Sequence, residues 1–406
     1  MGNSSSNDEP IREHARRAVR EAEETARQQA VERLGILDTP PEERFDRITR
    51  VARRLFGVPT AAVTLLDNAR QWAKSHDGEG LTEVARTDSF CSVAVRQDDT
   101  FVVADALRDA RFADNPLVRA DPAVRFYAGH PLRTADGHRV GMLCVTDSRP
   151  REMSEDERRL LRDLAQWAEN ELAAEDDLRR AAAVQAQLLP RAALRTGGWE
   201  VAGSCVPARA VGGDFYDWSL HGTTLRLVVA DVMGKGTGAA LMAAGVRAAV
   251  RGAWGSGDVR EVLTDVSRRI LADLSETGTF VTVFHAAADL PTGRLTYADA
   301  GHGLAWTVAP DGTTIWLHAE GLPLGISADG GWSALPAHVP PGGWIVCVSD
   351  GFLDALDSSL TRCQETVPRV HTCATAEEAV ALLAAQVSPA QATDDITLLV
   401  AHREAA

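Results

Sequence analysis

The segment VGGDFYD, residues 211–217, is followed by ADVMGKGTGAAL, residues 230–241, so that Asp214 and Asp231 stand on either side of an expected hairpin. Aspartate is a poor strand former, and a carboxylate at the end of an apolar strand usually caps a turn or holds an ion. The GKGTG that follows Asp231 predicts a tight turn leading into a helix. The positions of the other acidic residues indicate whether Asp214 and Asp231 cap turns or bind an ion.

Further carboxylates lie beside apolar runs later in the sequence. Asp350 ends WIVCVSD, and the pair Asp394 and Asp395 precedes ITLLV. One Asp-Gly after a strand is an ordinary turn, but strand ends from distant parts of a chain can bring several carboxylates into one cleft. Oxygen-only ligand sets suit Mg²⁺ or Mn²⁺ rather than zinc. The residues therefore predict a hard-cation site, and a two-ion site of this kind activates water and clamps a phosphoryl oxygen.

The glycine-rich turn also has to be compared with two nucleotide-binding motifs. A Walker A loop needs Ser or Thr after Gly-Lys, whereas Lys235 is followed by Gly236. Gly234, Gly236 and Ala239 do match the G-x-G-x-x-A of a dinucleotide-binding fold. That fold also needs a following strand with a terminal acidic residue, and GSGDVREVL leads into another helix instead. The dinucleotide interpretation is therefore disfavoured.

The composition is that of a soluble globular protein. The chain has 406 residues, of which 45% are hydrophobic and 24% charged, and its formal net charge is −15. This length predicts two domains, and the negative charge argues against a nucleic-acid or anionic-membrane partner. No apolar run is long enough to span a bilayer. The 6 cysteines show no zinc-ligand spacing, so we expect free thiols in a cytoplasmic protein.

The pattern of apolar residues predicts an α+β protein in which two domains are joined by a long helix. Helices are expected at 8–34 and at 154–190, and Ser154 with Glu157 forms a capping box for the second. The apolar seam of that long helix is interrupted by polar residues, so it fits a helix docked on one domain or the stalk of a parallel homodimer. After Gly198 the chain predicts helices at 238–253 and 258–274 and strands at 199–206, 213–219, 223–230, 279–289, 293–298, 304–309, 313–318 and 343–349, with DITLLVAH as the last.

The second half of the chain resembles a known family. From residue 185 to residue 402 the segments QAQLLP, VGGDFYD, ADVMGKGTGAAL, YADAGH, GLPLGI, VSDGFLDA and DDITLLV occur in the order typical of the SpoIIE-type branch of the PPM (type 2C) metal-dependent protein phosphatases. The resemblance implies a β-sandwich flanked by helices, with a two-metal cleft at one edge. It implies a catalytic and metal-ligating set of Asp214, Asp231, Asp350 and Asp394, with Val232 contributing its backbone carbonyl.

The resemblance leaves the roles of several neighbours open. Asp395 follows the ligand position and is expected behind the metal, although the pair could be swapped. Lys235 either meets the substrate phosphate or is a solvated loop lysine, and His302 is expected to be structural. The chain departs from the family at two positions. Asp354 stands where Glu is usual and Asp299 where Asn is usual, but neither removes a ligand, so the resemblance implies an active enzyme.

Residues 38–170 resemble a GAF sensor domain through RTDSFCSVAV, FVVADALRDARFADNPLV and VRFYAGHPLRTADGHRVGMLCVTD. GAF domains bind many ligands or none, and the sequence names no ligand. Five side chains could line a pocket, although each is more often ordinary packing: Trp72, His76, Phe90, Cys91 and Tyr127.

The expected domains are an N-terminal tail and helix at 1–37, the GAF domain at 38–170, a linker helix at 171–192 and the phosphatase domain at 193–406. The resemblances imply a GAF-regulated protein serine/threonine phosphatase that uses two Mn²⁺ or Mg²⁺ ions. They imply a phosphorylated anti-anti-sigma factor of a partner-switching pathway as its substrate. The contrasting hypothesis is a catalytically weak GAF-containing scaffold that binds phosphoproteins, and retention of all the ligand aspartates favours the enzyme.

Overall fold

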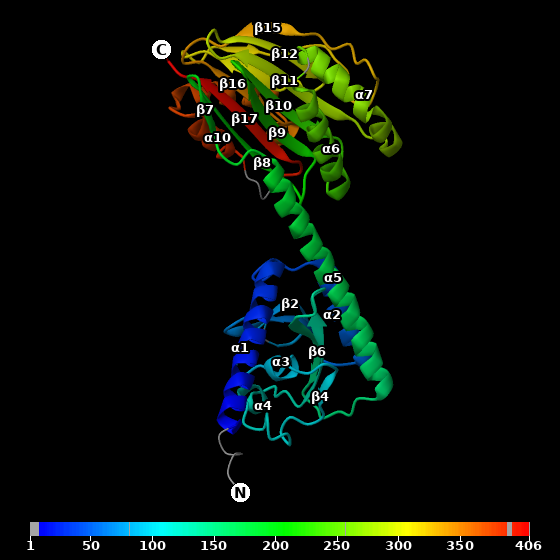
Figure 1. The fold of residues 1–406 in the computed structure, drawn as a ribbon. Coiled ribbons are helices and arrows are strands. Elements are labelled where there is room, and N and C mark those ends of the chain that lie inside the picture. Colours follow the sequence, from blue (N-terminus) through cyan, green and yellow to red (C-terminus); the bar gives the residue numbers. More distant parts are fainter. Residues whose placement is uncertain (1–7, 81, 256, 388–391, 406) are drawn as a thin grey trace. The chain divides into compact units, whose positions relative to one another are not determined.

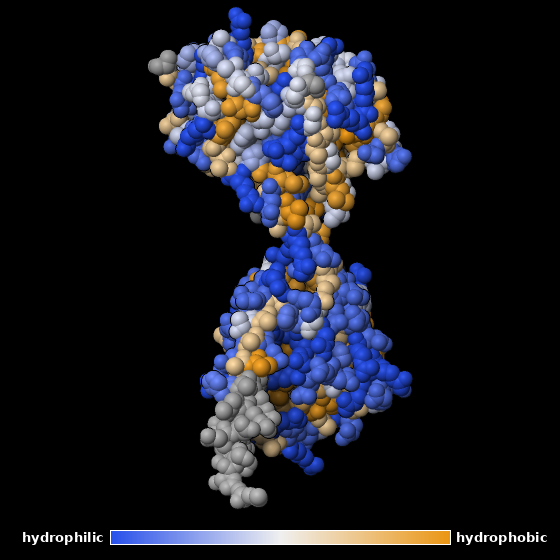
Figure 2. All heavy atoms as spheres, viewed as in Figure 1, coloured by the Kyte–Doolittle hydropathy of each residue, from blue (hydrophilic) through white to orange (hydrophobic). Residues whose placement is uncertain are grey.

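The computed structural model describes residues 8–80, 82–255, 257–387 and 392–405. The first residues of the predicted N-terminal tail, 1–7, lie outside these ranges. The chain divides into two compact units, residues 1–179 and 180–406, which are described separately below (Figure 1). Within the described ranges, no helix combines the length and hydropathy that a membrane span requires. Hydrophilic residues cover most of the visible face of each unit (Figure 2).

The first unit is an antiparallel sheet with helices on both faces. Side chains alternate along β1, so that Ala61, Val63 and Leu65 enter one core while Ala62 and Leu66 enter the other. The strand order is β3-β2-β1-β6-β5-β4. The elements are α1 (Asp8–Leu34), α2 (Glu43–Phe56), β1 (Thr60–Leu66), β2 (Arg70–Gly78), β3 (Glu83–Ala85), α3 (Phe90–Ala94), β4 (Phe101–Val103), α4 (Pro116–Arg119), β5 (Phe126–Arg133), β6 (Arg139–Asp147) and α5 (Glu155–Leu188).

Helices α1, α2 and α5 pack on one face of this sheet. Leu161, Leu164, Ala168 and Leu172 of α5 share a core with the apolar faces of α1 and α2, which accounts for the 3–4 spacing of its apolar residues. The predicted capping box is confirmed: the Ser154 N–H donates to Glu157 Oε2 at 2.7 Å and the Glu157 N–H to Ser154 Oγ at 3.2 Å. The last residues of α5 belong to the second unit.

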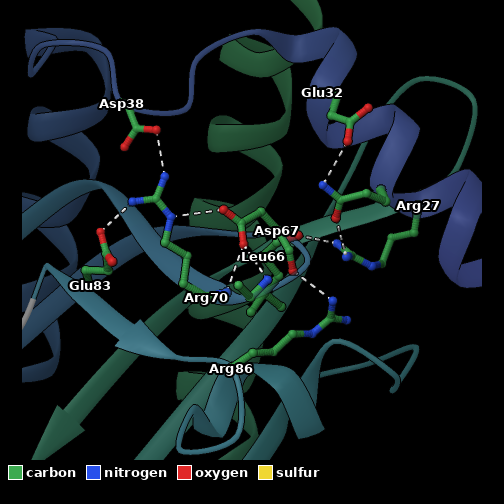
Figure 3. Close-up of polar contacts among 10 residues, drawn as sticks. Arg27, Glu32, Asp38, Leu66, Asp67, Arg70, Glu83 and Arg86 are labelled. Atoms are coloured by element: carbon green, nitrogen blue, oxygen red, sulfur yellow. Dashed lines mark hydrogen bonds and ion pairs between the residues drawn. The ribbon is translucent and has the colours of Figure 1, made fainter.

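Arginines fix α1 to the end of β1 (Figure 3). Arg27 on α1 donates to the Leu66 carbonyl at 2.5 Å, and Arg86 donates to the Asp67 carbonyl at 2.8 Å. Arg86 also pairs with Glu24 of α1 at 2.6 Å. Because Arg27 and Leu66 are both buried, the Arg27 guanidinium satisfies a carbonyl that water does not reach.

The second unit is a sandwich of two antiparallel sheets, ordered β15-β12-β11-β10-β9 and β14-β13-β16-β17-β8-β7. Helices α6 and α7 cover the outer face of the first sheet and α10 covers the second (Figure 1). The elements are β7 (Leu194–Thr196), β8 (Trp199–Val206), β9 (Asp214–His221), β10 (Thr224–Val232), α6 (Thr237–Ala253), α7 (Val259–Thr277), β11 (Val281–Asp289), β12 (Arg294–Ala300), β13 (Ala305–Val308), β14 (Thr314–Trp316), β15 (Leu335–His338), β16 (Trp344–Val348), α8 (Asp350–Asp354), α9 (Leu360–Thr366), α10 (Ala376–Ala384) and β17 (Ile396–Arg403).

Alternation along the strands builds the layers of this unit, which are helices, two sheets and helices. On β10, Leu227 and Val229 point into the core between the sheets, whereas Val228, Ala230 and Val232 pack under α6 and α7. The predicted fold class, an α+β protein with a helix-flanked sandwich, is confirmed, and so are the predicted strands and helices to within a few residues. The short strands β7 and β15, which lie at sheet edges, are not among the predicted elements. The cysteines are free, as expected.

A buried ion cluster holds α6 against β9. Asp217 is fully buried, and its carboxylate receives Arg251 Nε at 2.5 Å and Arg247 Nη2 at 2.9 Å. This role of the second aspartate of VGGDFYD is not predictable from its local sequence, because both arginines lie on a helix that follows the next strand.

We predict that Asp217→Ala lowers the free energy of unfolding by about 3–5 kcal/mol, because it leaves the half-buried Arg247 without a counter-ion. The control is Asp265→Ala on α7, which removes an exposed pair with Arg269 and should cost less than about 1 kcal/mol. Urea denaturation of both variants measures the difference. Equal losses in the two variants would show that the buried cluster does not hold α6.

Candidate metal centre

Asp214 and Asp231 meet across the hairpin of β9 and β10. Asp214 begins β9 and is the direct cross-strand partner of Asp231 near the end of β10, which places the two carboxylates on the same face of the sheet. Asp214 is only 3% exposed, and within the described residues its Oδ2 has no hydrogen-bond partner. Burial, together with the charge of Asp231, raises the pKa of Asp214 well above its usual range.

Asp350 brings a third carboxylate to the same place from the other sheet. It lies just after β16, at the first residue of α8. Burial and the charge of Asp350 raise the pKa of Asp231 to about 7, with smaller contributions from Asp394 and Asp395. Burial and the charge of Asp394 raise the pKa of Asp350 in turn. The charges that act on these carboxyls link Asp214 to Asp231, Asp231 to Asp350 and Asp394, and Asp350 to Asp394.

The structure gives the two adjacent aspartates before β17 different surroundings. Asp395 is buried, and its carboxylate accepts the N–H groups of Ala208 at 2.8 Å and Gly213 at 2.6 Å. Asp394 is more exposed, and its Oδ2 lies 3.0 Å from Lys235 Nζ. Both oxygens of Asp395 are therefore engaged with backbone, whereas Asp394 accepts one backbone N–H at Oδ1 and faces the Lys235 ammonium with Oδ2.

Two glycines make room for this arrangement. A Cβ on Gly212 would lie 2.4 Å from Asp395 Oδ2, and a Cβ on Gly213 would lie 2.6 Å from the Val232 carbonyl oxygen. Real Cβ atoms do not approach other atoms so closely, so the Gly-Gly pair is sterically required. Gly213 thereby leaves room beside the carbonyl that the family resemblance assigns as a ligand.

The chemistry of this donor set fits divalent cations. Among the described residues, no three His, Cys, Asp or Glu side chains are close enough to form a ready-made metal site. The buried Oδ2 of Asp214 nevertheless lacks a hydrogen-bond partner among the described residues, and burial together with repulsion raises the pKa of the Asp214, Asp231 and Asp350 carboxyls. Hard cations between such carboxylates would remove the repulsion and satisfy the free oxygen.

The remaining predicted residues near the centre have structural contacts. Lys235 also donates to the Thr393 carbonyl, so its ammonium is held by the loop before β17. Burial lowers the pKa of His302 to about 4, and its ring contacts the Val348 carbonyl at 2.9 Å. Asp299 accepts the N–H groups of His302 and Gly303 at 2.7 and 2.9 Å. Asp299 thus closes the turn after β12.

The five candidate pocket residues of the first unit do not share one site. Phe90, Cys91 and Tyr127 belong to the core under α3, where the Tyr127 hydroxyl lies 3.2 Å from Cys91 Sγ. Trp72 and His76 lie on β2, and Trp72 packs against the core on the other face of the sheet. Phe90, Cys91 and Tyr127 are therefore packing residues in this structure.

Comparison with known proteins identifies both halves. Residues 221–404 match the family model described as stage II sporulation protein E (SpoIIE), and residues 40–172 match the GAF domain model. Phosphoserine phosphatase RsbU of Bacillus subtilis (strain 168) is 30% identical to the chain over 234 residues, which are 55% of this chain and 69% of RsbU. The chain belongs to the SpoIIE-type branch of the PPM protein phosphatases.

Two further similarities cover different shares of the chain. Cyclic di-GMP phosphodiesterase PA2567 of Pseudomonas aeruginosa is 43% identical over 129 residues, but the match spans only 22% of that protein and 32% of this chain. The SiaA-PP2C domain of P. aeruginosa superposes with a TM-score of 0.51 at 24% identity, covering 58% of this chain and 99% of that domain. The second similarity shows that the two proteins share a fold.

We predict that Asp231→Asn stabilises the SpoIIE-type chain when metal is absent. Because the folded state raises the pKa of this carboxyl, its ionised form destabilises the fold at pH 8, and an amide of equal size should recover about 1–3 kcal/mol. Thermal unfolding in EDTA measures the gain. The control is Asp289→Asn at the end of β11, where hydrogen bonds from Thr292 lower the carboxyl pKa and no gain is expected. A loss of stability in Asp231→Asn would contradict the electrostatic account.

Proposed function

We propose that this protein is a metal-dependent protein serine/threonine phosphatase that hydrolyses phosphoserine or phosphothreonine on a regulatory protein. The observation that carries the proposal is the cross-strand pairing of Asp214 with Asp231, beside which the charges of Asp350 and Asp394 act on Asp231. These four side chains and the Val232 carbonyl would hold two Mn²⁺ or Mg²⁺ ions. The 30% identity to RsbU, a phosphoserine phosphatase, supports the same reaction.

Bound divalent cations would supply the Lewis acidity that activates a water and neutralises the phosphoryl oxygens. The residues of the chain would hold these cations and orient the substrate phosphate. Asp395 fixes the loop that carries Asp214, through the Ala208 and Gly213 N–H groups. Lys235 brings a positive charge to the edge of the cluster, where a phosphate dianion would gain from it. The proposed reaction consumes one water and releases phosphate and the free hydroxyl of the substrate side chain.

The substrate we propose is a phosphorylated anti-anti-sigma-like protein, with the GAF domain as the regulatory input and the cytoplasm as the location. The support is the SpoIIE-type membership together with the GAF match at residues 40–172. A homodimer through the helices remains a proposal, which light scattering tests by a mass of one or two chains. The catalytically weak scaffold is the competing function, and it predicts phosphoprotein binding without turnover.

We predict that turnover of a phosphoserine peptide requires Mn²⁺ or Mg²⁺ and stops when EDTA is in excess. The reason is that the proposed nucleophile is a water, whose pKa has to be lowered by a bound cation before it can attack at neutral pH. The measurement is phosphate release with and without metal. Undiminished turnover after complete removal of metal would overturn the proposal, and binding without turnover at saturating Mn²⁺ would favour the scaffold.

Two matched variants are compared in the same assay of phosphate release. Asp350→Asn should lower kcat/KM by about 100-fold or more, because an amide carries no charge for the ions. Asp354→Asn should cost much less, since that side chain accepts a hydrogen bond from Ser358 at 2.8 Å and has a supporting position. Equal effects of the two changes would mean that the ligand set is misassigned.

A further inference from the structure

The last turn of α5 is hydrogen-bonded to the loop that carries Asp214. Gln185 Nε2 donates to the Gly212 carbonyl at 2.6 Å, and the Gly212 N–H donates to Gln185 Oε1 at 3.1 Å. One side-chain amide therefore satisfies both backbone polar groups of Gly212. Both residues belong to the second unit, and Gly212 is buried. This pairing fixes the backbone two residues before Asp214.

The same loop is held by the buried Asp395. That carboxylate accepts the Gly213 N–H at 2.6 Å, and its Oδ2 lies where a Cβ on Gly212 would be. Gly212 is thus confined between a fixed carboxylate and the Gln185 amide. Since the loop has little room, a displacement of Gln185 has to be taken up by the backbone that leads into Asp214.

Other contacts fasten the end of α5 at the same place. The Tyr216 hydroxyl lies 3.1 Å from the Pro190 carbonyl and 3.0 Å from the Gly203 carbonyl. Leu189 packs against the core under α6 and against the core between the sheets. The apolar packing of Leu189 would hold the end of the helix even without the Gln185 amide. Packing of the helix end therefore does not explain why Gln185 makes two hydrogen bonds to Gly212.

We propose that Gln185 is a positioning residue for the metal centre, which couples the axial position and rotation of α5 to the binding of divalent cations by Asp214. The inference rests on the proposed function. A shift of α5 by a single residue moves a side chain by about 1.5 Å along the axis and about 100° around it. Neither hydrogen bond survives such a shift, so the Asp214 loop is held only in one register of the helix.

The test measures Mn²⁺ affinity by isothermal titration calorimetry on the full chain without substrate. Gln185→Ala should weaken Mn²⁺ binding about tenfold or more, as loss of a residue behind a metal ligand typically does. Gln187→Ala is the matched control, because Gln187 is exposed on the same helix and the change in helix propensity is identical. Gln185→Glu provides a second variant of equal length, in which a carboxylate faces the Gly212 carbonyl, and it should also weaken binding.

Three results would overturn the inference. Unchanged Mn²⁺ affinity in both Gln185 variants would show that Gln185 does not position the centre. A lower Tm in EDTA with unchanged affinity would reduce its role to docking of the helix. If the unaltered chain binds no Mn²⁺ and Asp214→Asn changes nothing, then the proposed function itself fails, which is a different result from a failure confined to Gln185.

Discussion

Repulsion between carboxylates at the ends of strands is the constraint on which the catalytic unit depends. Asp214 and Asp231 are direct cross-strand neighbours, and burial raises the pKa of both, together with the charge of Asp231 at Asp214 and the charge of Asp350 at Asp231. Such an arrangement lowers stability, so it persists only because the surrounding sandwich holds the strand ends in place. A cluster that is unfavourable by itself and favourable around cations is the expected signature of a metal centre.

Neighbouring residues hold the backbone in place despite the repulsion between these carboxylates. Asp395 uses its carboxylate to hold the loop that leads into Asp214, and Gly212 lacks the side chain that would collide with that carboxylate. Gly213 lacks the side chain that would collide with the Val232 carbonyl. The buried Asp217 cluster fixes α6, the helix that follows the glycine turn after Asp231. These contacts hold the backbone around the cluster, and among the described residues they leave Asp214 Oδ2 without a hydrogen-bond partner.

The sequence predicts elements better than it predicts contacts. Apolar alternation and turn residues give the strands from Trp199 to Val206 and across the Asp214 hairpin, because these depend on local patterns. They cannot distinguish Asp394 from Asp395, since adjacent residues have the same local pattern and only the tertiary contact of Asp395 with Gly213 separates them. Gln185 is missed for the same reason: its partner Gly212 lies beyond two intervening strands. The domain boundaries and ligand roles stay predictions.

The most direct test of the central claim is an anomalous difference map from crystals of the chain grown with Mn²⁺. The account predicts two peaks in the cluster, each about 2.0–2.2 Å from carboxylate oxygens of Asp214, Asp231, Asp350 or Asp394. Asp395 should keep its hydrogen bonds to backbone and contact neither ion. A map without peaks in this cluster at saturating Mn²⁺, or with peaks on other residues only, would contradict the account.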